Sequence, residues 1–155
     1  MSPDCRLSVT VRPTHDPDEI AAALELRVQV FCEEQGVAPD EELDGRDHDC
    51  TQIVALDEKG VLATCRLRPI EGAAKLERMA VDRRVRGSGV GQRLLARAEE
   101  EAHASGAPRM VLHAQRSAEA FYAKGGYQVE GDPFMEAEIE HVRMTKDLTP
   151  LDRAP

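Results

Sequence analysis

Apolar residues recur along the first part of the chain with two different periods, and each period predicts a different element. Leu7, Val9 and Val11 alternate with polar residues, which is typical of a strand with one buried face. Pro13 follows and predicts the end of that strand, because proline cannot donate a hydrogen bond to a neighbouring strand. Residues 16–36 begin with acids, continue with apolar residues at helical spacing and end at a glycine, which predicts a helix.

The middle of the chain predicts a loop, a hairpin and a further strand. Residues 38–50 are polar and acidic, with a proline and a glycine but no period, which is typical of a loop. Two apolar runs within 51–70 flank the sequence Asp-Glu-Lys-Gly. Gly60 suits a tight turn there, so we predict a β-hairpin. Residues 75–81 predict the next strand.

A glycine-rich turn at 86–91 then leads into a helix. The apolar residues of this helix fall on one face, as expected for a helix that packs on a sheet. The segments that follow are predicted as a buried strand, a short helix capped by Ser117 and two further strands: 108–115, 117–126, 127–131 and 140–148.

Length and composition limit the architecture and the class of partner. The 155 residues contain no repeat or linker, so we predict one mixed α/β domain over 1–155 with its core at 5–148. The net charge of −9, the 3% aromatic content and the absence of Trp argue against a nucleic-acid partner, because that binding needs clustered cations or stacking rings. Four distant cysteines and no long apolar run predict a cytoplasmic protein with reduced thiols and no membrane partner.

The turn at 86–91 has the features of an anion site. Glycines at a helix start let backbone amides approach a phosphate group, and the helix dipole favours negative charge there. A Rossmann fingerprint counted from Gly87 requires glycine where this chain has Gln92, and the lysine that closes a P-loop is absent. Two interpretations stay open on these residues alone: a different pyrophosphate cradle, or a tight turn.

The residues around this turn resemble the acetyl-CoA-binding motif of the GNAT superfamily of N-acetyltransferases. In that family a strand ending in Val precedes Arg/Gln-x-x-Gly-x-Gly/Ala and a helix, and here the motif falls on 86–91 after Val81. The downstream segment 115–127 is similar to the family's Asn-x-x-Ala and Tyr-x-Lys-x-Gly-Phe pattern, with Gln115 in place of Asn and Tyr127 in place of Phe. The chain looks most like a subgroup of small GNAT proteins.

The resemblance implies a single-domain GNAT-like α/β fold with acetyl-CoA as co-substrate. Its mixed central sheet would have about six to seven strands flanked by helices. The strand at 75–81 would splay from the strand at 109–115 and leave a cleft for the pantetheine arm, while the turn takes the pyrophosphate. The implied cofactor-binding residues are Met79, Ala80, Val81, Arg86, Gly87, Ser88, Gly89, Val90, Gly91, Gln92 and Gln115.

The resemblance also implies catalytic residues for acetyl transfer to an amine. Tyr122 aligns with the family's general acid, and Glu77 stands where several members place a carboxylate that takes the amine's proton through water. His141 and His113 are alternative bases, because histidine has a suitable intrinsic pKa. Each position also has a plainer interpretation: a packed tyrosine, a solvated strand carboxylate and structural histidines.

The acceptor is predicted to be a primary amine, either a small molecule or part of a peptide. The acidic run 33–49 is either a solvated loop or a lip that attracts a cationic amine. Asp47-His48-Asp49 is too sparse for a metal site, so no metal is expected. The alternatives are a non-catalytic acyl-CoA-binding module of the same fold and a metal-dependent enzyme built on His48, His113 and His141. Family members are often dimers, so a homodimer is a further expectation.

Overall fold

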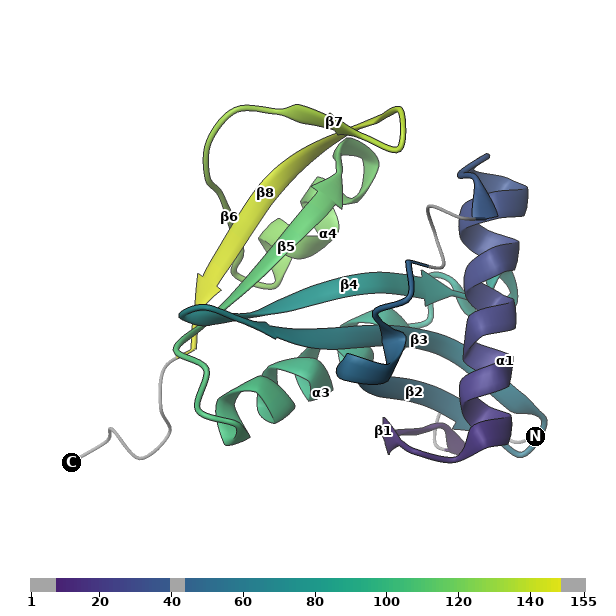
Figure 1. Ribbon diagram of the computed structural model, residues 1–155. Coiled ribbons are helices and arrows are strands. Elements are labelled where there is room, and N and C mark those ends of the chain that lie inside the picture. The colour runs from purple at the N-terminus through teal and green to yellow at the C-terminus, as the bar shows by residue number, and fades with distance from the viewer. Residues whose placement is uncertain (1–7, 40–43, 149–155) are drawn as a thin grey trace.

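The computed structural model describes residues 8–39 and 44–148, which form a mixed α/β fold around one open, twisted sheet (Figure 1). The sheet has eight strands in the order β1-β2-β3-β4-β5-β8-β6, and β7 pairs with β8. Neighbouring strands are antiparallel, except that β4 and β5 run parallel. The strands are β1 (Thr10–Thr14), β2 (Thr51–Asp57), β3 (Gly60–Ile70), β4 (Ala73–Val81), β5 (Arg109–Gln115), β6 (Gln128–Val129), β7 (Phe134–Glu136) and β8 (Ile139–Asp147).

Helices cover both faces of the β1–β4 half of the sheet, with α1 on one side and α3 on the other (Figure 1). The main core lies under α3, where the apolar stripe expected from the sequence packs on the strands. A smaller cluster lies under the first helix and consists of Leu26, Val30 and Ala80. The helical elements are α1 (Pro17–Arg27), its π-helical continuation η2 (Val28–Glu34), α3 (Val90–Ala104), α4 (Glu119–Lys124) and the 3₁₀ turns η3 (Asp47–Asp49), η4 (Arg83–Val85) and η5 (Arg116–Ala118).

The central feature of the sheet is a fork between β4 and β5. The two strands pair only over three positions, and the last of them is Leu76 opposite Leu112. Beyond that pair β4 continues beside β3, while β5 turns away with β8 (Figure 1). A bulge in β4 lies just past the fork, where Arg78 has a positive φ of 58°. The splayed strands that the resemblance implied are therefore present.

The predicted fold class is confirmed, and three local predictions need correction. Pro13 lies inside β1 rather than ending it, because β1 is an edge strand whose free side needs no N–H donor. Ser117 does not cap α4: the helix follows the turn η5, and Ala118 precedes its first residue without a side-chain cap. The strand β7 was not predicted, because the tight turn that pairs it with β8 uses the non-glycine residues Ala137 and Glu138 at positive φ.

Candidate functional site

The glycine turn holds an open backbone surface at the start of α3. Gly87 and Gly89 have φ of 82° and 92°, and a Cβ on either glycine would meet nothing within 4 Å. Gly89 is the N-cap residue of α3, and the first N–H groups of a helix have no partner within the helix. Gly91 differs, because a Cβ there would contact the Phe121 ring at 3.4 Å. The turn therefore has donors and space for an anion.

Two cavities meet at the fork between β4 and β5. One, of about 840 Å³, lies under the glycine turn and is lined by Val81, residues 85–89 and Phe121, among others. The other, of about 670 Å³, lies between the diverging strands. The residues that line both cavities are Gln35, Met79, Arg86, Ala118 and Tyr122.

Most of the predicted cofactor-binding residues line these cavities, but two do not. Ala80 is buried under η2 with Val30, and Val90 is buried in the main core. Neither side chain faces a cavity, so only the backbone of these two residues is available to a ligand. Gln115 lines the cavity between the strands, and its Nε2 donates to Gln35 Oε1 at 2.6 Å.

The end of η2 contacts the groove a second time through Glu34, which pairs with Arg86. Arg86 donates through Nη2 to Glu34 Oε1 at 2.9 Å and through Nε to the Val81 carbonyl at 2.9 Å. A second cation, Arg83, lies 3.8 Å from the same glutamate. The arginine predicted to meet the pyrophosphate thus holds a carboxylate in this structure.

Tyr122 lies where the two cavities join. It is 8% exposed, and the Phe121 and Tyr127 rings pack edge-on against its own ring. Its hydroxyl contacts Met79 Sδ at 3.6 Å, and a thioether is a weak acceptor. Burial raises the pKa of Tyr122 well above its ordinary value. The hydroxyl is therefore protonated at neutral pH and has a proton to donate.

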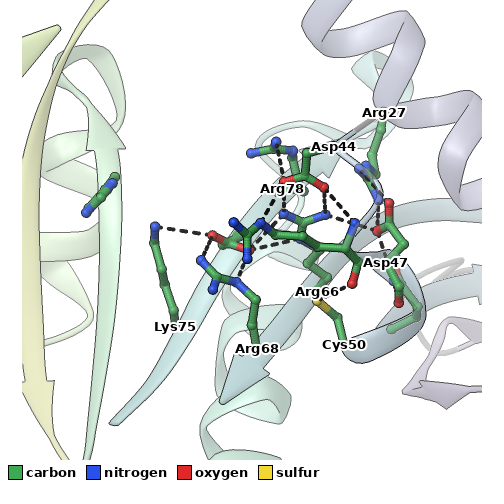
Figure 2. A network of polar contacts seen from close by, with 12 residues as sticks. Arg27, Asp44, Asp47, Cys50, Arg66, Arg68, Lys75 and Arg78 are labelled. Carbon is green, nitrogen blue, oxygen red and sulfur yellow. Dashed lines mark hydrogen bonds and ion pairs between the residues drawn. The ribbon is translucent and has the colours of Figure 1, made fainter. Parts of the chain in front are cut away.

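Glu77 lies at the cavity as predicted, but three cations surround its carboxylate. Arg66 and Arg68 approach it at 2.9 Å each and Lys75 at 3.2 Å. Figure 2 labels these three cations. Burial alone would raise the pKa of Glu77, but the hydrogen bond from Arg68 and the neighbouring charges outweigh it and lower the pKa to about 2. A carboxylate of such low pKa is a weak proton acceptor at neutral pH.

Asp44 and Asp47 of the acidic run join the same network from the other side. The fully buried Arg66 donates two hydrogen bonds, of 2.8 and 2.9 Å, to the Asp44 carboxylate. The buried Arg27 of α1 binds Asp47 at 2.6 Å (Figure 2). The hydrogen bond from Arg66 is the main cause that lowers the pKa of Asp44. These two carboxylates point inward and are neutralised, so they give a cationic acceptor no support, whereas Asp49 is exposed.

Two histidines reach the cavity between the strands. His141 of β8 is 7% exposed, and its Nδ1 lies 2.7 Å from the Ile139 carbonyl. His113 of β5 lies with its Nδ1 2.9 Å from Glu136 Oε1. Glu136 was not among the predicted site residues, because the strand that carries it was not predicted. His48 lies apart from both on the exposed turn η3.

The described residues contain neither a metal-binding cluster nor a membrane-spanning helix. Within 8–39 and 44–148 no group of three His, Cys, Asp or Glu side chains could hold a metal ion. In the same part of the chain no helix combines the length and the apolar character needed to cross a bilayer.

A forked parallel strand pair with a glycine turn above it is the arrangement that the GNAT resemblance implied, and comparisons with known proteins agree. A family model described as an acetyltransferase (GNAT) domain matches residues 11–148. YjcF of Bacillus subtilis, an uncharacterized N-acetyltransferase, is 35% identical over 131 residues, which cover 84% of this chain and 94% of YjcF.

Solved structures show the same fold. An acyl-CoA N-acyltransferase from Pseudomonas aeruginosa has a TM-score of 0.78 and 28% identity, and the match covers 89% of this chain and 98% of that one. An aminoglycoside 6'-N-acetyltransferase complexed with coenzyme A shares the fold at a TM-score of 0.77 and 16% identity, with 91% and 98% covered. The chain belongs to the GNAT acetyltransferase family, and the predicted class of enzyme, an acyltransferase, is confirmed.

Proposed function

We propose that this protein transfers the acetyl group of acetyl-CoA to a primary amine by direct attack within a ternary complex. The observation that carries the proposal is the meeting of two cavities at the fork, with Met79 and Tyr122 at their junction. A thioester at that junction would face the cofactor groove on one side and an acceptor cavity on the other.

The groove under the glycine turn suits the pyrophosphate and pantetheine of the co-substrate. The amides at 87–92 and the N-terminus of α3 would bind the pyrophosphate, because a helix start favours anions. The backbone of Met79 and Val81 would pair with the amides of the pantetheine arm, since β5 leaves this edge of β4 beyond Leu76. Arg86 would exchange Glu34 for phosphate oxygens.

The reaction needs two proton transfers. The amine nitrogen attacks the thioester carbonyl carbon, a C–N bond forms, and the C–S bond breaks as the tetrahedral intermediate collapses. Tyr122 would donate its proton to the departing sulfur, because the hydroxyl lies at the junction and has only a thioether beside it among the contacts described. The amine's proton must go to a base. Glu77, His141 and His113 stay predictions for that role, and the ion pairs of Glu77 weaken its case.

The acceptor cavity, about 670 Å³, is of the size that binds small molecules. We therefore favour a small-molecule amine over a peptide. Within the cavity, Asp44 and Glu77 are both held by arginines, so recognition of the amine rests on shape and on the remaining polar groups.

The test is release of the coenzyme A thiol when acetyl-CoA is incubated with a panel of amines. Release that depends on an amine supports the enzyme, whereas tight binding of acetyl-CoA without release across the panel supports a non-catalytic acyl-CoA-binding module. Tyr122→Phe should lower the rate and leave acetyl-CoA binding intact. Tyr127→Phe is the matched control, because this buried tyrosine binds Glu99 at 2.8 Å outside both cavities and should alter stability but not turnover.

A further inference from the structure

His113 stands at the root of the fork. The last paired positions of β4 and β5 are Leu76 and Leu112, so Glu77 and His113 are the first residues beyond the fork on their strands. Successive side chains of a strand point to opposite faces of the sheet. The two leucines belong to the core under α3, so the glutamate and the histidine project to the opposite face. Both line the cavity between the strands.

A carboxylate from a different strand holds this imidazole. His113 Nδ1 lies 2.9 Å from Oε1 of Glu136 on β7, and the Phe134 ring packs edge-on at 4.9 Å. The hydrogen bond with His113 is the main cause that lowers the pKa of Glu136, so this carboxylate is ionised at neutral pH. An ionised carboxylate can only accept, so Nδ1 carries a proton, and in the neutral form of the ring Nε2 is then the nitrogen with the free lone pair. The pair is a histidine–carboxylate dyad.

The other two candidate bases lack this combination. Three cations surround the Glu77 carboxylate, and protonation of Glu77 would weaken its ion pairs with all three. His141 donates to a neutral backbone carbonyl and lies opposite Gln115, two positions further along β5 from the fork. A carboxylate beside an imidazole stabilises the imidazolium that forms when the ring takes a proton, and a carbonyl does so less strongly.

We propose that His113 is the general base of the acetyl transfer and that Glu136 positions it. The inference rests on the acetyltransferase function proposed above. Nε2 of His113 takes one proton from the attacking amine as the C–N bond forms. Glu136 holds the ring by its Nδ1–H and balances the new positive charge. The departing thiolate takes the proton of Tyr122. Water then returns a proton from the His113 imidazolium to the Tyr122 phenolate, which restores both groups and balances the protons.

The experiment is a pH profile of kcat/KM for an accepted amine at saturating acetyl-CoA. His113→Gln should lower kcat/KM about 100-fold and flatten the fall at low pH, because general-base catalysis contributes about this factor. Glu136→Gln should lower kcat/KM about tenfold and change the low-pH part of the profile, since the imidazolium loses its ionic partner. Both variants should bind acetyl-CoA within about twofold of the wild type, as the dyad lies outside the cofactor groove.

Several charged groups face the dyad. They are Lys75 and Glu77 of β4 and His141 and Arg143 of β8. The pH profile therefore reports the ionisation of the whole group of charges. A role for one residue is supported only if the profile changes when that residue is replaced. The matched controls are His48→Gln on the exposed turn η3 and Glu140→Gln on the neighbouring strand, where the carboxylate binds Arg116 instead. Both controls should keep the wild-type profile.

A wild-type rate and profile in His113→Gln would overturn the inference, as would loss of the low-pH fall in Glu77→Gln or His141→Gln alone. If His113→Gln does not fold, Glu136→Gln decides, because its side chain is 43% exposed and its loss leaves the core intact. An unchanged profile in that variant then refutes the dyad. A wild-type protein that binds acetyl-CoA but acetylates no amine refutes the proposed function itself, and the role of the dyad with it.

Discussion

Replacing Glu77 by Gln tests whether this carboxylate is a structural anchor. The ion pairs with Arg66, Arg68 and Lys75 lower its pKa from 4.5 to about 2. A difference of about 2.5 pKa units corresponds to about 3 kcal/mol of unfolding free energy. The side chain is only 8% exposed, so solvent screening reduces this value little. We therefore expect Glu77→Gln to lower the unfolding free energy at pH 7 by about 3 kcal/mol.

The pH dependence gives the prediction its sign. A carboxylate with a lowered pKa in the folded state stabilises the protein above the pKa of the unfolded chain, and this stabilisation is lost as the pH falls through the folded pKa. The difference between wild type and Glu77→Gln should thus be about 3 kcal/mol at pH 7 and about 1 kcal/mol at pH 3.

Urea unfolding of both proteins at intervals from pH 7 to pH 3 measures this difference. Glu101→Gln is the control, because this glutamate forms an i,i+4 pair with Arg97 on the surface of α3 and should cost less than about 0.5 kcal/mol. A difference below about 1 kcal/mol at pH 7, or one that does not change with pH, would refute the reasoning.

Three other predictions concern the cofactor groove and the proton donor. Gly89→Val should raise the acetyl-CoA dissociation constant at least about tenfold in calorimetry, because φ of 92° strains a β-branched residue. The control Gly106→Val has the same φ and equal space but lies outside the groove, so it should bind acetyl-CoA as the wild type does. Glu34→Gln should lower the acetyl-CoA dissociation constant about threefold, since the Glu34 carboxylate competes with the pyrophosphate for Arg86. Weaker acetyl-CoA binding in this variant would contradict that competition. Tyr122→Phe should lower kcat about 100-fold without moving the low-pH fall in activity. Wild-type activity should persist beyond pH 10, because burial raises the pKa of Tyr122 above its ordinary value. A fall in wild-type activity near pH 10 would contradict this raised pKa.

Local sequence patterns predicted much of the fold and many of the residues that line the groove under the glycine turn. The hairpin around Gly60, the helix stripe of α3 and the glycine turn at 86–91 depend on residues close in sequence, and period and turn chemistry report such contacts directly. Tyr122 could be named as a candidate because a short motif surrounds it. The resemblance to the family also pointed to Glu77, but it could not show what the carboxylate binds.

The tertiary structure decided which charges meet. Arg66 faces Asp44, 22 positions away, and His113 faces Glu136, 23 positions away on a strand that no pattern predicted. Contacts of this kind depend on sheet register and loop placement, which a one-dimensional pattern does not encode. The sequence by itself determined the order of most elements, the position of the glycine turn and the resemblance to the family. Only the folded sheet determined that Glu77 is neutralised by cations while His113 holds a carboxylate at the fork, because burial and charge pairing arise when distant strands come together.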